Sequence, residues 1–477
     1  MIALRPLSAA LLAALLLSSS GASAQSQSAA TILGADSRSV VTLTLYNGGF
    51  GQVSEERRIA LPAGRSRLVL KDLAASLRAE TLSLSGPGLV VIEQSLNRDL
   101  LTPQALLEAH LGKEVRVARI DPETGEETVE TGRLLSVAQG PVIQIGDRIE
   151  TAPPGRLIFG ELPPGLSAEP QLLTLIESAG AAASLALDYI APGLGWQADY
   201  RAEIDEAESK LALVALVSLS NDSGVAFEDA KVRLIAGSIL QLGGPMPYAQ
   251  AGQEMMMTRA AAPPAKADVA AVSFSDRHLY LLPEPLSLAK GERKQVTLFS
   301  AESVAMTRGY RLRGLIDPFG NSGELGPQAA EILVEVENEK AVGLGRPLPA
   351  GALRVYEAAA EGPPVFTGES RIDHTPEGER LELTLGEAFG VTGRSTTTAH
   401  ERLSSRAFET AQAIVLANAK DEAVEVLVEG PLARGWNWSV LEESQPHEPG
   451  DARRLSWRVT VPARGEVTLS YRVRATQ

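Results

Sequence analysis

Residues 185–237, LALDYIAPGLGWQADYRAEIDEAESKLALVALVSLSNDSGVAFEDAKVRLIAG, decide the fold class of this chain. Apolar residues recur with a period of two in 185–189 and again in 196–200. This alternation is typical of β-strands that bury one face. The two runs are separated by the turn Pro192–Gly195, so each predicts a strand of its own.

The second half of the same stretch predicts two more strands. Leu213–Leu219 is a nearly continuous apolar run, which predicts a strand buried on both faces. It ends at Asn221–Gly224, residue types that reverse a chain, and 232–236 form the return strand. No helix-period segment interrupts the four strands. We therefore predict one hydrophobic sheet that packs in an antiparallel sandwich.

Length, composition and charge limit the classes of protein that fit. The 477 residues suffice for several domains, and a hydrophobic content of 44% is that of a packed globular protein. The net charge of −15 argues against nucleic acid as a partner, because phosphate binding needs a basic surface. Cysteine is absent, which excludes a disulfide framework and a lipid-bearing cysteine.

The first 24 residues have the pattern of a secretory signal peptide. Arg5 supplies the positive charge, Ala9–Leu17 the apolar core, and Ala22–Ala24 the small-residue cleavage site. The apolar core is too short to span a bilayer, and no later apolar stretch is long enough. We expect a periplasmic or secreted protein that begins at Gln25 and has no transmembrane segment.

The chain divides into five predicted parts. They are the signal peptide (1–24), an N-terminal β domain (25–100), a short helix plus a small β-barrel (101–160), a central β-sandwich with a mobile loop at 241–271 (161–320) and a C-terminal β-sandwich (321–477). The helix has Thr102 as N-cap and Pro103 in its first turn, and Gly112 ends it. The short strands of 114–150 are typical of a five-stranded SH3 or Sm-type barrel.

The predicted loop is rich in Ala, Pro, Gly and Met. Met246 and Met255–Met257 suggest copper(I), because thioethers are soft ligands. No His or Cys lies near them in the sequence, so we interpret 241–271 as a mobile loop and predict no cofactor.

Two signatures recur along the chain. One is a strand that ends at Asn, and the other is a turn of the Ala-x-Gly type that predicts a hairpin. The strand ends are Asn47, Asn221, Asn338 and Asn418, and the turns are at Gly64, Gly291 and Gly465. Their uneven spacing indicates several related immunoglobulin-like sandwich modules rather than a solenoid.

Several segments together resemble a known family. They are YIAPGLGWQADYRAEI (189–204), SLSNDSGVAFEDAKVRLIAG (218–237), LGRPLPAGALRVYE (344–357), IDHTPEGERLELTLGEAF (372–389) and VTVPARGEVTLSYRV (459–473). In this order they resemble the bacterial secreted proteins grouped around mucoidy inhibitor A, described mainly as a domain of unknown function. The resemblance runs from about residue 39 to 474. It implies an exported all-β protein and supplies no catalytic residues. The long coiled-coil insert of some relatives is missing here, so no partner role of that insert carries over.

Two groups of residues are candidates for a site. One group could hold a metal through imidazole and carboxylate ligands, namely Asp373, His374, Glu377 and Glu379. It contains a single nitrogen ligand, and it lies at a Pro-Glu-Gly turn, where polar residues are commonly just solvated. Trp436 and Trp438 stand two apart, on one face of a strand, and are candidates for stacking on a sugar or peptide. The structural alternative is that both Trp side chains seal the sandwich core together with Trp457.

Catalytic motifs are missing from the sequence. G-x-S-x-G and H-E-x-x-H do not occur, and the 59 acidic residues single out no catalytic pair. We therefore predict an exported, non-enzymatic cell-envelope protein whose sandwich modules bind an envelope protein or a glycan. The alternative is a hydrolase that acts on peptidoglycan or exopolysaccharide through loop carboxylates.

Overall fold

The fold is taken from a computed structural model. It describes residues 30–477 apart from 99, 152, 154, 164, 181, 206–208, 238, 240–270, 275–276, 318–322, 360, 432–434 and 450–453. The predicted signal peptide and all but Ala271 of the predicted loop 241–271, including its four Met residues, lie outside the described residues.

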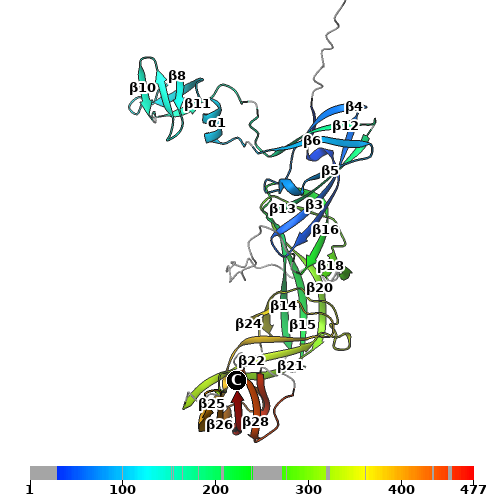
Figure 1. Cartoon of the computed structure of the whole chain (residues 1–477), viewed down its shortest axis with the longest axis vertical. Coiled ribbons are helices and arrows are strands. Elements are labelled where there is room, and N and C mark those ends of the chain that lie inside the picture. The colour runs from blue at the N-terminus through cyan, green and yellow to red at the C-terminus, as the bar shows by residue number, and fades with distance from the viewer. Residues whose placement is uncertain are drawn as a thin grey trace, which may run out of the picture.

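Strands dominate the chain, which confirms the all-β prediction, and the sheets follow one another along an elongated body (Figure 1). The N-terminal sheet has the order β1-β4-β12-β6, with β1 (Thr31–Leu33), β4 (Gly64–Leu70), β12 (Gln171–Ser178) and β6 (Leu89–Asn97). The described residues also form three short 3-10 helices, namely η1 (Ala35–Ser37), η2 (Ala79–Thr81) and η3 (Lys340–Val342).

Two central sheets face each other. The first central sheet contains, in order, β17 (Ala271–Phe274), β18 (Arg277–Leu281), β16 (Phe227–Ala236), β2 (Arg38–Tyr46), β3 (Phe50–Leu61), β13 (Ala182–Pro192) and β5 (Ser83–Ser85), with β19 (Leu286–Leu288) beside β16. The second central sheet contains β20 (Arg293–Ala305), β15 (Lys210–Asn221), β14 (Leu194–Asp205), β23 (Gly351–Glu357) and β24 (Val365–Ile372). Most pairs are antiparallel. The parallel ones, such as β14 with β23, join segments that are distant in the sequence.

The stretch 185–237 forms the four predicted strands, β13 to β16. The prediction that they share one sheet is wrong, because β13 and β16 belong to the first central sheet and β14 and β15 to the second. The chain changes layer at Gly193. Its φ of 84° lies in the left-handed region, which favours glycine. A Cβ atom at this position would also lie only 2.9 Å from the Asp222 carbonyl oxygen. The expectation for Leu213–Leu219 is also wrong in part, since the second face of β15 is only half-buried.

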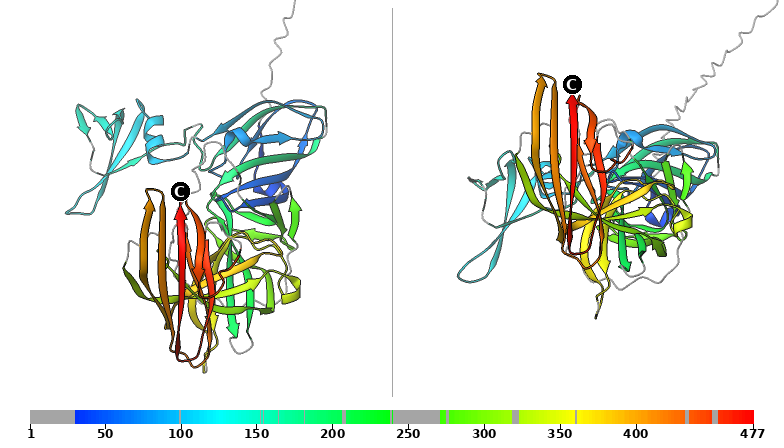
Figure 2. Two further views of the ribbon diagram at one scale, coloured as in Figure 1. Left: turned by 60° about the horizontal axis from the view of Figure 1, so that its bottom comes forward. Right: turned by 90° about the horizontal axis from the view of Figure 1, so that it is seen from below.

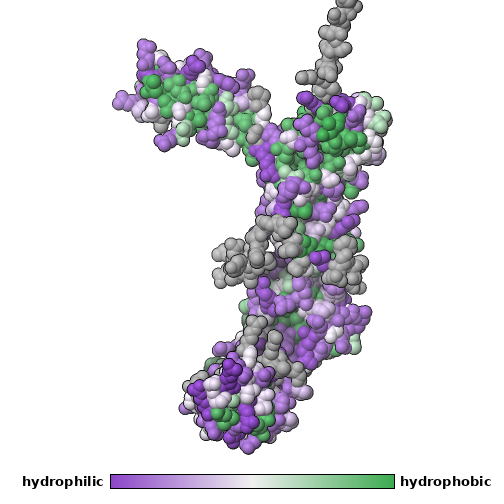
Figure 3. Space-filling model, in the orientation of Figure 1, coloured by the Kyte–Doolittle hydropathy of each residue, from purple (hydrophilic) through white to green (hydrophobic). Residues whose placement is uncertain are grey.

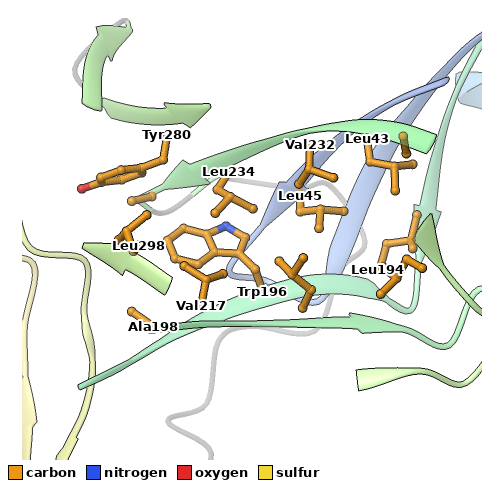
Figure 4. Packing of buried hydrophobic residues seen from close by; sticks show 14 of the residues in the cluster. Leu43, Leu45, Leu194, Trp196, Ala198, Val217, Val232, Leu234, Tyr280 and Leu298 are labelled. Carbon is orange, nitrogen blue, oxygen red and sulfur yellow. The ribbon is translucent and has the colours of Figure 1, made fainter. Parts of the chain in front are cut away.

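The space between the two central sheets is the main hydrophobic core (Figure 4). Trp196 of β14 is 4% exposed and lies among side chains of both layers, including Leu45 and Leu234. Its Nε1–H donates to the Ile235 carbonyl oxygen at 3.2 Å, so the polar atom of this large ring is satisfied inside the core. This packing confirms the predicted sandwich.

A small half-barrel projects from the body as an arm (Figure 1). It contains α1 (Pro103–Ala109) and the strands β10 (Arg148–Thr151), β9 (Val142–Ile145), β8 (Glu127–Ser136), β7 (Glu114–Ile120) and β11 (Arg156–Ile158), in that order in the sheet. The fifth strand returns beside the first, but no pairing of β10 with β11 closes the sheet within the described residues, so it is a half-barrel and the SH3 or Sm type stays a prediction. Thr102 caps the helix as predicted, since its Oγ1 accepts a bond from Ala105 N–H at 3.0 Å.

The arm is an insertion between β6 and β12, which pair with each other in the N-terminal sheet. Its two connections run together, because Leu101 N–H donates to the Ser167 carbonyl oxygen at 2.8 Å. The arm also has its own small core around Val117 and Ile143. It therefore leaves and rejoins the body at one place.

The C-terminal sheet encloses a second large core. Figure 2 shows the orange and red strands of this sheet side by side. Its order is β28 (Asn437–Glu443), β30 (Gly465–Thr476), β26 (Ala407–Asn418), β25 (Arg380–Ser404), β22 (Glu324–Glu337), β21 (Thr307–Arg313), β27 (Val424–Pro431) and β29 (Arg454–Val461). The long strands β22 and β25 contribute to both cores: Leu383 of β25 lies in the main core and Val391 in the second. The two sandwiches are thus joined by continuous strands.

The three Ala-x-Gly turns do not make the predicted hairpins. Each joins two strands that do not pair with each other: β3 to β4 at Gly64, β19 to β20 at Gly291, and β29 to β30 at Gly465. The turn residues specify only that the chain reverses. The neighbours of each strand follow from which layer buries its apolar face. We call these layer-crossing turns arches, and a fourth arch at residues 375–379 joins β24 to β25.

Buried asparagines hold three of the four arches. In each case the strand that pairs with the second strand of the arch ends at the asparagine (Asn221 and Asn418) or directly before it (Asn338). Each side-chain amide nitrogen donates hydrogen bonds to backbone carbonyl oxygens, some in the arch and some in the turn that follows the asparagine itself. The distances are 2.7 to 3.4 Å. All three side chains are at most 2% exposed, whereas the fourth strand-end residue, Asn47, is exposed.

Candidate functional site

The predicted metal ligands lie in one of these arches. Thr375 and Pro376 give their carbonyl oxygens to the Asn338 amide at 3.3 and 2.8 Å, and Glu377 pairs with Lys340 at 3.2 Å on the surface. Asn338 N–H donates to the backbone oxygen of Glu379. The segment therefore has a structural role that its sequence did not indicate. Within the described residues, no three His, Asp or Glu side chains are grouped as ligands for a metal ion.

His374 lines a cavity. It shares the cavity with Arg277, His278 and Tyr280, which lie on or at the start of β18. The sequence predicts that the strands resume at 278–282, and β18 confirms a strand there that begins and ends one residue earlier. Nothing in the sequence indicates that this strand meets residue 374, because a packing contact between distant segments leaves no local pattern.

Trp436 and Trp438 are both half-buried at β28. Trp438 packs against the second core, and the Trp436 ring lies 5.6 Å from the Phe408 ring. Trp457 is fully buried and stacks on Tyr471 at 4.7 Å. The structure thus gives the Trp pair a packing role, and a ligand stacked on it stays a prediction.

The buried carboxylates of the described residues are each held by arginine. They are Glu55 with Arg57 and Arg38, Asp199 with Arg354, Glu409 with Arg472 and Arg474, and Glu429 with Arg313 and Arg454. The hydrogen bonds from Arg474 and Arg472 lower the pKa of Glu409. A general acid needs the opposite shift, so Glu409 suits a structural ion pair rather than proton transfer.

The outer face of the N-terminal sheet carries an exposed apolar strip. Ile32 pairs with Val69 across β1 and β4, and Val69 pairs with Leu173 across β4 and β12. Ile32 is 60% and Leu173 40% exposed, on the face opposite to the buried Leu70. Figure 3 shows the hydrophobic surface over this sheet. A row of apolar side chains that remains in water is a common mark of an interaction surface.

The strand β6 forms the edge of the same sheet. In the described part of the chain it pairs only with β12, so the backbone groups on its other side face no strand. Val90 and Ile92 on this strand are 63% and 44% exposed. Between Leu175 and Ile176 the register shifts by one residue, which leaves Ile92 at a bulge. A nine-residue edge with apolar side chains is suited to accept a further strand.

Neither the scan against protein-family models nor the search of the curated proteins finds a match to this chain. The resemblance to the mucoidy inhibitor A group therefore stays a prediction. None of the helices among the described residues has the length and apolar character needed to cross a bilayer.

Proposed function

We propose that this chain is an exported cell-envelope protein without catalytic activity, which binds a protein partner along the edge strand β6. The observation that carries the proposal is the open edge of β6 with exposed Val90 and Ile92. Main-chain N–H and C=O groups of such an edge pair with an extended segment of another protein, and the flanking side chains give specificity. The strip of Ile32, Val69 and Leu173 lies on the outer face of the same sheet and adds apolar contact area.

A protein suits this surface better than a glycan does. Backbone pairing needs a partner with its own amide groups, and the strip presents aliphatic side chains rather than aromatic rings. Export is supported by the signal-peptide pattern of residues 1–24 and by the family resemblance. The cell-envelope location rests on those two sequence features.

The alternative function is a hydrolase that acts on peptidoglycan or exopolysaccharide. Such an enzyme needs one carboxyl that donates a proton and a second that acts as base or nucleophile. In this chain Glu55, Asp199, Glu409 and Glu429 are tied to arginine side chains, which supports a structural role for these four. Their environment favours the binding function over the hydrolase.

A pull-down tests the proposed function. The purified chain is immobilised, and partners are captured from a Gram-negative envelope extract with the wild type and with the double variant Val90→Lys, Ile92→Lys. Lysine on an edge strand opposes strand addition, so we expect the double variant to lose the captured protein. The matched control is Val129→Lys, Ile149→Lys, because these side chains are 51% and 64% exposed on the arm. Equal capture by both variants would refute the β6 site.

A further inference from the structure

The bulge in β6 decides which side chains of this strand lie on the outer face of the N-terminal sheet. Residues that stand opposite each other on paired strands share a face, and every second residue of β12 faces outward. The outward residues of β12 and their partners on β6 are Leu173 with Ser95, Leu175 with Glu93, and Glu177 with Val90. Because Ile92 is the extra residue at the bulge, Val90, Glu93 and Ser95 occupy three successive outward positions.

Glu93 stands at the middle of these three positions and carries an exposed charge. Its carboxylate takes part in no hydrogen bond or salt bridge of the described residues. The basic residue in the same cross-strand row is Arg67 on β4, and Leu175 lies between the two. Two strand spacings amount to about 10 Å, so Arg67 does not neutralise Glu93. Glu177, the neighbouring acid on this face, is instead paired with Arg65 at 3.8 Å.

The two positions that flank Glu93 favour apolar side chains on an added strand. Val90 is 63% exposed and offers an apolar contact to the residue beside it. Ser95 stands at the end of the exposed apolar strip of the sheet, in the same row as Leu173. An apolar side chain next to Ser95 would continue that strip by one strand. Apolar cross-strand neighbours of this kind stabilise a sheet.

A second copy of the chain does not meet these requirements. Two β6 strands that pair antiparallel over all nine residues, Leu89–Asn97, are centred on Glu93. The two carboxylates would then stand directly opposite each other, and like charges in that position destabilise a sheet. A charge on an edge strand is also a common device against self-association. The occupant of this edge is therefore a different protein.

We propose that the partner of β6 contributes an extended segment in which a lysine or arginine stands between two apolar residues at alternate positions. The proposal rests on the function proposed above for β6 and adds the chemistry of the partner segment. The basic side chain lies beside Glu93, where it supplies the missing opposite charge, and the apolar side chains lie beside Val90 and Ser95. The two intervening residues of the segment face the inner side of the sheet, next to Val91 and Gln94.

Synthetic peptides test this charge preference. The probe has the order Thr, Val, Thr, Lys, Thr, Val, Thr with blocked ends, and two matched peptides carry Glu or Gln in place of Lys. Fluorescence anisotropy of the labelled peptides with the chain from Gln25 onward measures each Kd. We expect the Lys peptide to bind about threefold to tenfold more tightly than the Glu peptide, with the Gln peptide between them. The difference should shrink at high ionic strength, because the charge pair is exposed to solvent.

Three variants of the chain assign the preference to one residue. Glu93→Lys should reverse the order, so that the Glu peptide binds more tightly than the Lys peptide. Glu466→Lys is the matched control: it changes the net charge by the same amount at an exposed position of β30, and it should keep the order of the wild type. The double variant Val90→Lys, Ile92→Lys should lose the Lys peptide, which locates the binding on β6.

Two results would overturn the charge preference and leave the function of β6 intact. One is equal affinity for the Lys and Glu peptides, with binding that is lost in the double variant. The other is an unchanged order of affinities in Glu93→Lys. Absence of binding by all three peptides at millimolar concentration would contradict strand addition at β6 itself, and the proposed segment with it.

Discussion

Single buried side chains hold the arches of this protein in place. Asn338 is fully buried, and its amide bonds the carbonyl oxygens of Arg346, Thr375 and Pro376, while its own oxygen accepts from Arg346 N–H. Asn221 and Asn418 repeat this arrangement in the other two arches. A short amide suits the position, because it offers donors and an acceptor within reach of the backbone. The sequence shows that Asn recurs at strand ends. It does not show that three of these residues are buried.

Removal of the Asn338 amide should destabilise the chain. In Asn338→Ala three carbonyl oxygens lose the hydrogen bonds of the side-chain amide, although two of them keep a backbone donor, and we expect a cost of about 2 kcal/mol of unfolding free energy. Urea unfolding followed by circular dichroism measures the change. Asn47→Ala is the matched control at an exposed strand end and should change stability by less than about 0.5 kcal/mol. Equal effects of the two variants would contradict the structural role of the buried amide.

Glu409 should make stability depend on pH in a defined direction. Hydrogen bonds from Arg474 and Arg472 lower its pKa in the folded state, so its contribution is complete above the unfolded pKa of about 4.3. The contribution is lost as the pH falls through the lowered pKa. The stability gap between wild type and Glu409→Gln should therefore be widest above about pH 5 and close toward about pH 3. Exposed Glu466→Gln is the control, and a gap that stays constant with pH would contradict the assignment.

At the scale of strands, periodicity and turn chemistry could predict where elements lie but not which elements pair. The four strands of 185–237 and the capped helix at Thr102 follow from local patterns. The turn at Gly465 reads as a hairpin, yet β29 pairs with β27 and β30 with β26 and β28. Pairing depends on which layer buries each apolar face, and that information is spread over the whole chain. For the same reason the cavity around His278 and His374 could not be predicted.

The continuous strand β25 should couple the two sandwiches. Leu383 is fully buried in the main core, and the same strand enters the second core at Val391. Leu383→Ala should cost about 3 kcal/mol through the lost burial and the cavity it leaves. Because the chain has no cysteine, single dye labels at Ser39→Cys and Ser439→Cys report on the two sandwiches separately. We expect both labels to show the same shift of the unfolding midpoint, whereas a shift at Ser39→Cys alone would mean that the sandwiches unfold independently.

At the scale of the molecule, the protein is an elongated body with one lateral arm (Figure 1). The arm has a separate core, and its two connections meet at Leu101 and Ser167. An insertion of this kind adds surface without sharing the packing of its host.

Deletion of the arm should leave the body folded. Replacement of residues 102–166 by a short Gly-Ser linker keeps β6 and β12 in register, since their ends are already close. We expect the melting temperature of the shortened chain to lie within about 5 °C of the full chain in calorimetry. Aggregation of the shortened chain, with loss of its β-sheet circular dichroism, would show that the arm supports the body.

Amide hydrogen exchange on the chain with its captured partner tests the central claim most directly. Strand addition at β6 gives the outward-facing N–H groups of Leu89–Asn97 a hydrogen-bond acceptor, so these amides should exchange more slowly in the complex than in the free chain. The exposed strand β10 of the arm should keep its rate. Unchanged exchange along β6, with protection at another surface, would contradict the account.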